Sequence, residues 1–205
     1  MQIKPVKFVQ MKCLPLIGAL AFHFICSAQK NETDIPYRKD DGLKEDNSFI
    51  YSLPYRKGES HLLVQAYQSR FSHKNEFALD FRMHKGSKVC AARSGVVVEV
   101  KEDSRRGGLK AKFLSEGNHV IIRHDDGTYG NYWHLRHNGV LVQVGDSVVQ
   151  GQLIALSGNT GYTAFPHLHF EVTTEFTAGR NQIPTRFHTR KGDRYLKPLH
   201  WYRAF

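Results

Sequence analysis

Hydrophobic and polar residues alternate along most of the chain in short runs that turn residues separate. The runs are rich in Val, Ile, Phe and Tyr, and turn signals such as Asp125-Asp126-Gly127, Asn138-Gly139 and Gly145-Asp146 lie between them. The expected strands are 61–67, 77–81, 88–91, 95–100, 118–123, 128–134, 141–144, 152–156 and 167–172. No segment has a helical period. We therefore predict an all-β fold, a compact antiparallel β-sandwich or barrel-sandwich hybrid with little helix.

The pattern changes along the chain and predicts four parts. Residues 1–28 have the features of an export signal, and residues 29–60 form a polar, weakly patterned arm. Residues 61–175 contain all the expected strands and form the predicted domain. Residues 176–205 are a C-terminal extension in which the pattern weakens. A chain of 205 residues suits one domain of ordinary size with short extensions.

The N-terminus resembles a secretory signal peptide. Three lysines precede a mainly apolar stretch, residues 14–25, and the small pair Ser27-Ala28 stands before the expected cleavage site. The apolar stretch is too short for a stable membrane span. We therefore expect an exported protein, located in the periplasm, in the cell envelope or outside the cell. Cleavage leaves Cys90 as the single cysteine, and its apolar neighbours predict a buried thiol.

The charge balance favours an anionic partner. The whole chain has a net charge of +10, and removal of the three lysines of the signal lowers it to +7. Nucleic acid and acidic envelope polymers both fit such a surface. The basic residues are scattered and no nucleic-acid-binding module accompanies them, so we expect no nucleic acid as a partner. Export favours a polymer of the cell envelope.

The segment with the most chemical information is Pro166-His167-Leu168-His169-Phe170. Its alternation predicts a strand, in which His167 and His169 point to the same face. Neutral imidazole is the commonest protein ligand for zinc, so this pair could supply half of a metal site. The alternative is a chance alternation of histidines and apolar residues on a half-exposed strand.

Three further residues fit such a site. Asp80 is an acid inside an otherwise apolar strand, where a buried carboxylate needs a cation or strong donors; a neighbouring Arg82 or Arg93 could also supply them. His73 precedes that strand, and His134 ends another β-rich run. By themselves, these two histidines read as a solvated loop residue and a strand cap. Six further histidines have no spacing that indicates a place in this site: His61, His119, His124, His137, His188 and His200.

Residues 71–173 resemble the lysostaphin-type, or LytM-like, zinc endopeptidases, which cut peptide cross-links in bacterial cell walls. The matching motifs occur in the family's order. They are His73 and Asp80; Gly-x-x-Val-x-Ala-Ala-x-x-Gly-x-Val at 86–97; residues 122–129; Tyr132-Trp133-His134-Leu135; Gly145-Asp146 to Gly151-Gln152; Ser157 to Gly161; and the stretch 166–170. Each motif is weak alone, but the ordered set is highly specific.

The resemblance implies roles for five residues. The family's zinc ligands correspond to His73, Asp80 and His169, which would bind one Zn²⁺ per chain. Two further site histidines correspond to His134 and His167, which in the family assist water deprotonation and stabilise the oxyanion. Strands would hold His134 and His167 more rigidly than loops would.

The first motif departs from the family pattern. The family's histidine stands four residues before the aspartate, but Glu76 occupies that position here and His73 lies seven residues before Asp80. Either the loop carries an insertion that still delivers His73, or Glu76 ligates. A third option is His84, which would share the face of Asp80 if the strand persists. We favour His73.

The resulting hypothesis is an exported zinc-dependent endopeptidase that hydrolyses peptide cross-links of peptidoglycan by metal-activated water, with peptidoglycan peptides as its partner. The first alternative is a non-catalytic protein of the same fold that binds the wall or activates another hydrolase. The second is a carrier module of the biotinyl type, suggested by residues 144–154, but the chain has no lysine between methionines to modify. The sequence leaves the scissile bond and the oligomeric state open.

Overall fold

The computed structural model describes residues 49–69, 71–176 and 181–205. The predicted signal peptide and most of the predicted arm lie outside these residues. Apart from one short helix, the regular elements of the described part are all strands, which confirms the prediction of an antiparallel all-β fold with little helix. One 3-10 helix, η2 (Ala111–Glu116), lies in a connection between two strands, although no helical period marks this segment in the sequence.

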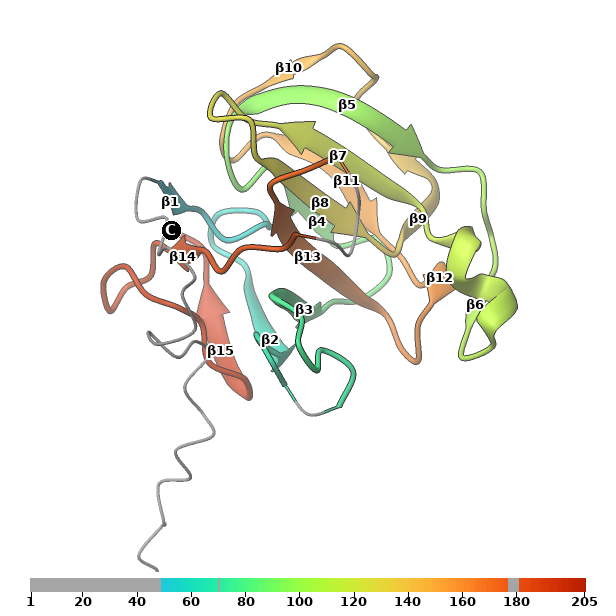
Figure 1. Cartoon of the computed structure of the whole chain (residues 1–205), viewed down its shortest axis with the longest axis horizontal. Coiled ribbons are helices and arrows are strands. Elements are labelled where there is room, and N and C mark those ends of the chain that lie inside the picture. Colours follow the sequence, from blue (N-terminus) through green and yellow to red (C-terminus); the bar gives the residue numbers. More distant parts are fainter. Residues whose placement is uncertain (1–48, 70, 177–180) are drawn as a thin grey trace, which may run out of the picture. The chain divides into compact units, whose positions relative to one another are not determined.

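Strand β13 (His167–Thr173) lies inside an eight-stranded sheet of order β10-β5-β7-β8-β13-β3-β2-β15 (Figure 1). Its other members are β2 (Ser60–Gln65), β3 (Ala78–Arg82), β5 (Gly95–Lys101), β7 (His119–Arg123), β8 (Tyr129–Trp133), β10 (Ser147–Val148) and β15 (His200–Arg203). All pairings within this sheet are antiparallel. The position of β13 between β8 and β3 gives its histidines neighbours on both sides.

Three smaller sheets complete the described part. β4 (Lys88–Cys90), β11 (Leu153–Ser157) and β9 (Leu135–Val140) form a three-stranded antiparallel sheet. Two short parallel pairs join β1 (Ile50–Tyr51) to β14 (Arg186–Phe187) and β12 (Gly161–Tyr162) to β6 (Gly107–Gly108). Among the described residues, no helix has the length and apolar character needed to cross a membrane.

The hydrophobic core takes side chains from the large sheet and from the three-stranded sheet. Phe81, Phe170 and Tyr132 of the large sheet and Ile154 and Leu135 of the smaller sheet are all fully buried in the same cluster. Cys90 is also buried, as the sequence predicted. Alternate residues of β3 and β13 therefore face this core, and the residues between them face the other side of the sheet.

Residues on both sides of the predicted domain limits contribute to this core. Tyr51 and Tyr55 lie in the predicted arm, and Phe187 and Leu196 lie in the predicted C-terminal extension; all four are buried in the same cluster. The division of the chain into an arm, a domain and an extension stays a prediction. Within the described residues, the packing is continuous across both limits.

One predicted strand is wrong. Residues 141–144 are not a strand, and the strand β9 ends just before them, at Val140. The pair Asn138-Gly139, which indicated a turn, lies inside β9. Asn138 takes a positive φ of 48° there, a conformation that asparagine tolerates better than most residues. Leu141 and Val144 are left exposed, so their apolar character does not reflect burial.

Candidate metal centre

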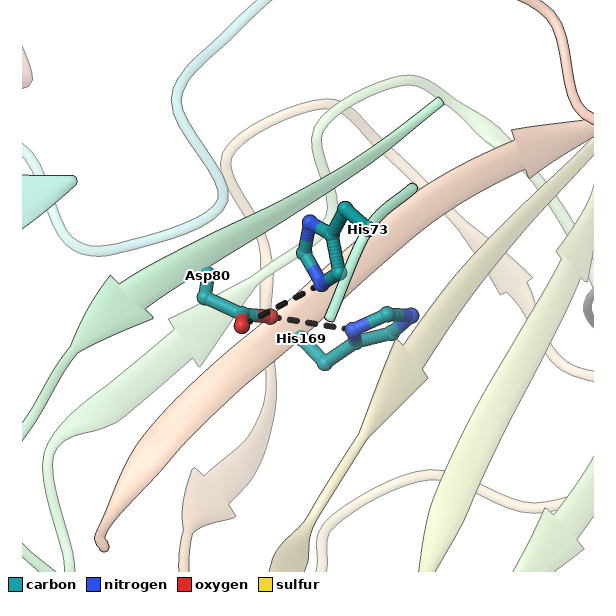
Figure 2. A group of neighbouring side chains, drawn as sticks. All are labelled: His73, Asp80 and His169. Atoms are coloured by element: carbon teal, nitrogen blue, oxygen red, sulfur yellow. Dashed lines mark hydrogen bonds and ion pairs between the residues drawn. The ribbon is translucent and has the colours of Figure 1, made fainter. Parts of the chain in front are cut away.

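Three of the predicted residues converge at one point on the face of the large sheet opposite the core. His169 of β13 is the register partner of Asp80 of β3, and His73 reaches the same point from the loop before β3 (Figure 2). His73 Nε2 lies 3.2 Å from Asp80 Oδ2, and His169 Nδ1 lies 2.9 Å from Asp80 Oδ1. One nitrogen or oxygen atom from each residue lies within 4.8 Å of the others.

Hydrogen bonds fix Asp80 and His73 in this arrangement. Asp80 Oδ2 accepts a hydrogen bond of 2.6 Å from Gln65 Nε2 on β2. His73 Nδ1 donates to the backbone carbonyl of Ala78 at 3.0 Å, which orients the ring with Nε2 toward Asp80. Burial acts to raise the pKa of Asp80, but hydrogen bonds from His169 and His73 lower it well below its usual range. Asp80 is therefore an ionised carboxylate.

His169 lies between two carboxylates. Its Nδ1 faces Asp80, and its Nε2 lies 3.9 Å from Glu171 Oε2 two residues further along β13. Burial acts to lower the pKa of His169, but the interactions with Asp80 and Glu171 raise it to about 10. A proton on His169 thus balances the buried negative charge when no other cation is present.

His134 and His167 form the second part of the site. Their ring centroids are 4.6 Å apart, and His167 Nε2 lies 3.5 Å from Asp80 Oδ1. His134 Nδ1 donates to Thr160 O at 2.7 Å, and His167 Nδ1 donates to Phe165 O at 2.8 Å. Burial, with smaller effects of His167 and His169, lowers the pKa of His134 to about 3, and burial also lowers the pKa of His167. Both imidazoles are therefore neutral, with Nε2 free to accept a proton.

The conformation of His134 depends on a close contact between two loops. His134 has a positive φ of 64°, which is uncommon for a residue other than glycine and often marks a functional site. The carbonyl that holds its ring belongs to Thr160, beside Gly161. A Cβ added at Gly161 would lie 2.7 Å from the Cα of Gly117, so only glycine allows these loops to approach.

The atoms that meet at this site fit a divalent cation. His73 and His167 each donate Nδ1–H to a backbone carbonyl, which orients each Nε2 atom toward the ionised Asp80. Nitrogen atoms of several imidazoles and a carboxylate thus converge on one point. Two imidazoles and one carboxylate are the ligand set of many catalytic zinc sites. The donor set therefore suits zinc in chemistry, number and burial.

The alternatives that the sequence left open lie elsewhere. Glu76 stands on the wall of the cleft but is not part of the three-residue cluster, and His84 is exposed beyond the end of β3. The alternative pairing of Asp80 with an arginine is wrong. Arg93 pairs with Asp125 and Asp126, and none of the ion pairs among the described residues joins Arg82 to Asp80.

A cleft of about 650 Å³ opens over the site. Exposed apolar side chains from three separate segments line it, among them Phe71, Leu114 and Tyr162. His134, His167 and the three clustered residues line it as well. A ligand in this cleft would therefore meet both apolar surface and the five predicted site residues.

Sequence reasoning missed three supporting residues, Glu171 and two neutral amides. Gln65 holds Asp80 and also contacts Ser72 of the His73 loop, and Gln182 donates to Glu171 and accepts from the backbone of Phe77. A neutral amide carries no signal by itself in a sequence. For Glu171 there was a signal, because an acid between Phe170 and Val172 in an apolar strand repeats the pattern that singled out Asp80.

Comparison with known proteins gives the family. The model of peptidase family M23 matches residues 74–183, more than half of the chain, beginning one residue after His73. The glycyl-glycine endopeptidase ALE-1 of Staphylococcus capitis is 32% identical over 148 residues, 72% of this chain and 37% of that protein. The peptidoglycan DD-endopeptidase ShyA of Vibrio cholerae is 38% identical over 93 residues, 45% of this chain and 19% of that protein.

Among solved structures, the catalytic domain of lysostaphin from Staphylococcus simulans is similar with 29% identity and a TM-score of 0.47. The match covers 62% of this chain and 87% of that domain. The chain spans well under half the length of ALE-1 and ShyA. The match of the family model over residues 74–183 means that this chain belongs to peptidase family M23.

Proposed function

We propose that this protein is an exported zinc-dependent endopeptidase that hydrolyses peptide cross-links of bacterial peptidoglycan. The observation that carries the proposal is the convergence of His73, Asp80 and His169, whose candidate ligand atoms lie within 4.8 Å of one another at the base of a cleft. Membership of peptidase family M23 and the similarity to a glycyl-glycine endopeptidase and to a peptidoglycan DD-endopeptidase support it.

His73, Asp80 and His169 would hold the zinc ion. When bound in such a site, zinc lowers the pKa of a water ligand and polarises a carbonyl group. Two imidazoles and one carboxylate leave a net positive charge there, which suits the hydrolysis of an amide without a serine or cysteine nucleophile. Gln65 and the carbonyl of Ala78 would hold Asp80 and His73 in position, because both make hydrogen bonds to them.

His134 and His167 would carry out the proton transfers of the hydrolysis. Each has Nδ1 fixed on a backbone carbonyl and lines the cleft, so the ring orientation is set before substrate binds. A neutral imidazole accepts the proton of the attacking water, and a histidine that carries a proton donates to the developing oxyanion. We assign these two roles to the pair, without dividing them between the two residues.

The proposed site of action is outside the cytoplasm. Residues 1–28 supply the predicted signal, and cleavage would leave a mature chain with one buried cysteine, Cys90. A protein that forms no internal disulfide can act in the periplasm or at the cell surface. Its net positive charge also suits an acidic wall polymer.

Substitution of His169 tests the proposal. Purified peptidoglycan is incubated with zinc-loaded wild type, His169→Ala and the control His188→Ala, and the released fragments are separated by chromatography. His188 is exposed, pairs with Asp193 and does not line the cleft over the site, so we expect wild-type digestion from that control. For His169→Ala we expect a loss of about 1,000-fold or more. Undiminished digestion by a folded His169→Ala protein would overturn the metallopeptidase assignment.

The identity of the first ligand has its own test. We expect His73→Ala to weaken zinc binding by about 100-fold or more, since it removes a buried nitrogen from the cluster. Glu76→Ala should retain about one zinc per chain, because Glu76 only lines the cleft. Zinc content after dialysis and competition with a chromophoric chelator measure both. Loss of zinc from Glu76→Ala with retention in His73→Ala would reverse the assignment.

A further inference from the structure

A row of four side chains leads from the candidate metal centre across the sheet to its edge. His167 of β13 is the register partner of Arg82 of β3, Arg82 is the partner of Leu62 of β2, and Leu62 is the partner of Trp201 of β15. Directly paired residues of antiparallel strands point to the same face. Arg82, Leu62 and Trp201 therefore continue the face on which His167 lies; we call these three residues the shelf.

The neighbouring row confirms which face the shelf occupies. Leu168, Phe81 and Leu63 are paired with one another across the same three strands, and all are fully buried in the core. The shelf residues alternate with them and face outward: Arg82 is exposed, Leu62 is half-buried and Trp201 is 70% exposed. The loop that carries His73 joins β2 and β3 at their other ends, so it does not separate the shelf from His167.

The shelf and its surroundings are cationic. Arg203 shares the face of Trp201 two residues along β15, and both are exposed. Beyond the sheet edge, Trp201 borders a pocket of about 370 Å³ that Lys191, Arg194 and Lys197 also line. Within the part of the chain that the structure describes, none of these cations nor Arg82 forms an ion pair. An acidic ligand would therefore meet unpaired positive charge.

The dimensions suit a ligand that also occupies the candidate metal centre. Three strand spacings separate β13 from β15, which places Trp201 about 14 Å from His167 along the row. An extended peptide of four residues spans about the same length. Peptidoglycan joins short peptides with free carboxylates to chains of amino sugars. An exposed tryptophan offers a flat apolar surface on which a sugar ring can stack, and arginine binds carboxylates.

We propose that the shelf binds the sugar-proximal part of the substrate, with an amino sugar on Trp201 and a carboxylate of the attached peptide on Arg82. This inference rests on the proposed peptidase function and narrows its substrate class to cross-linked peptides that are still attached to glycan. Leu62 and Trp201 lie outside residues 74–183, so this subsite lies partly beyond the part of the chain that the family model matches.

The test compares one cross-linked peptide with and without its disaccharides. For the wild type we expect kcat/KM to be about tenfold or more higher on the sugar-bearing substrate, mainly through KM. In Trp201→Ala this preference should fall to about threefold or less, and Trp201→Phe should restore most of it. Leu199→Ala is the matched control: Leu199 is 76% exposed, precedes the same strand and lies outside the shelf, so it should keep the full preference.

Binding to the metal-free protein gives a second readout. Calorimetry with the uncross-linked disaccharide-tetrapeptide should show about tenfold weaker binding to Trp201→Ala and to Arg82→Gln than to the wild type. Equal kcat/KM on the two substrates, or a preference and affinity unchanged in Trp201→Ala, would refute substrate binding at the shelf. Either result would leave the proposed peptidase function intact. Failure of the zinc-loaded wild type to cleave either substrate would instead refute the proposed function. The calorimetric data alone would then show whether the shelf binds the disaccharide-tetrapeptide.

Discussion

Several histidines of this chain, four of which are compared below, share one local arrangement and differ in the surroundings of the second ring nitrogen. In His73, His124, His134 and His167, Nδ1 lies within hydrogen-bond distance of a backbone carbonyl. The Nε2 atoms of His73 and His167 approach Asp80, whereas Nε2 of His124 is buried without a hydrogen-bond partner among the described residues. A shared tautomer thus serves a candidate metal site in one place and packing in another.

His124 should make the protein sensitive to mild acid. Burial lowers its pKa to about 4, well below the value of about 6.5 expected in the unfolded chain. Between these pH values the unfolded state binds more protons, so the free energy of unfolding falls as the pH drops below about 6.5 and levels off below about 4. The loss due to His124 between pH 7 and pH 4.5 should be about 2 kcal/mol.

The variant His124→Asn isolates this effect. Its amide can still donate to the carbonyl of Ser94, but it does not titrate. Urea unfolding of wild type and variant at both pH values, each without metal, gives the comparison. Between the two pH values, the free energy of unfolding of the wild type should fall by about 2 kcal/mol more than that of the variant. Parallel pH dependences would show that His124 stays neutral in both states or is charged in both.

At the residue scale, charged and titratable residues of the candidate site can be predicted from the sequence, whereas its neutral supporting residues cannot. Asp80 stands out because a carboxylate in an apolar strand needs a partner, and the spacing of His167 and His169 follows from strand geometry. Gln65 carries no such signal. It meets Asp80 because the register of β2 and β3 shifts between Leu63 and Gln65, and an irregularity of that kind depends on pairing between strands.

At the scale of the elements, alternation predicts faces but not neighbours. The runs 77–81 and 167–172 correspond closely to β3 and β13, and each correctly divides core residues from site residues. That His169 lies opposite Asp80 depends on which strands pair, and these two residues are far apart in the chain. The family resemblance supplied this pairing as an implication, since the alternation within each strand contains no information about it.

One turn should depend on a buried arginine. Arg93 is 6% exposed, bonds Asp125 and Asp126 in the turn between β7 and β8, and lies 4.0 Å from the centre of the Phe49 ring. Loss of the guanidinium would leave Asp126 without its cation and remove the cation–π contact. We expect Arg93→Met to lower the free energy of unfolding by about 2 to 3 kcal/mol.

Lys101 provides the matched comparison for Arg93. It pairs with Asp103, whose side chain is 80% exposed, so water screens the interaction. Lys101→Met should therefore leave the urea midpoint of unfolding unchanged within error. If Arg93→Met also left the urea midpoint unchanged, the ion pairs of Arg93 with the two aspartates would not stabilise the turn. Packing of β7 against β8 alone would then have to account for its conformation.

At the scale of the whole molecule, the part that carries the family signature is smaller than the part that shares one core. All five predicted site residues except His73 lie within residues 74–183, yet Tyr51, Phe187 and Leu196 lie outside and are buried with the rest. β14 pairs with β1, and β15 pairs with β2, which in turn holds Gln65 beside Asp80. The C-terminal segment thus supports the site through two strands.

Removal of residues 184–205 should therefore unfold the protein although every predicted site residue remains. The truncation deletes β14 and β15, takes the fully buried Phe187 and Leu196 from the core, and exposes the edge of β2. Phe187→Ala alone should cost about 3 to 5 kcal/mol, a large share of the stability of a typical domain. Phe205→Ala removes a ring that is 45% exposed and should leave the melting temperature nearly unchanged. Thermal unfolding followed by near-ultraviolet circular dichroism distinguishes the three proteins. A cooperative transition near the wild-type temperature in the truncated chain would mean that residues 184–205 lie against a core that is complete without them.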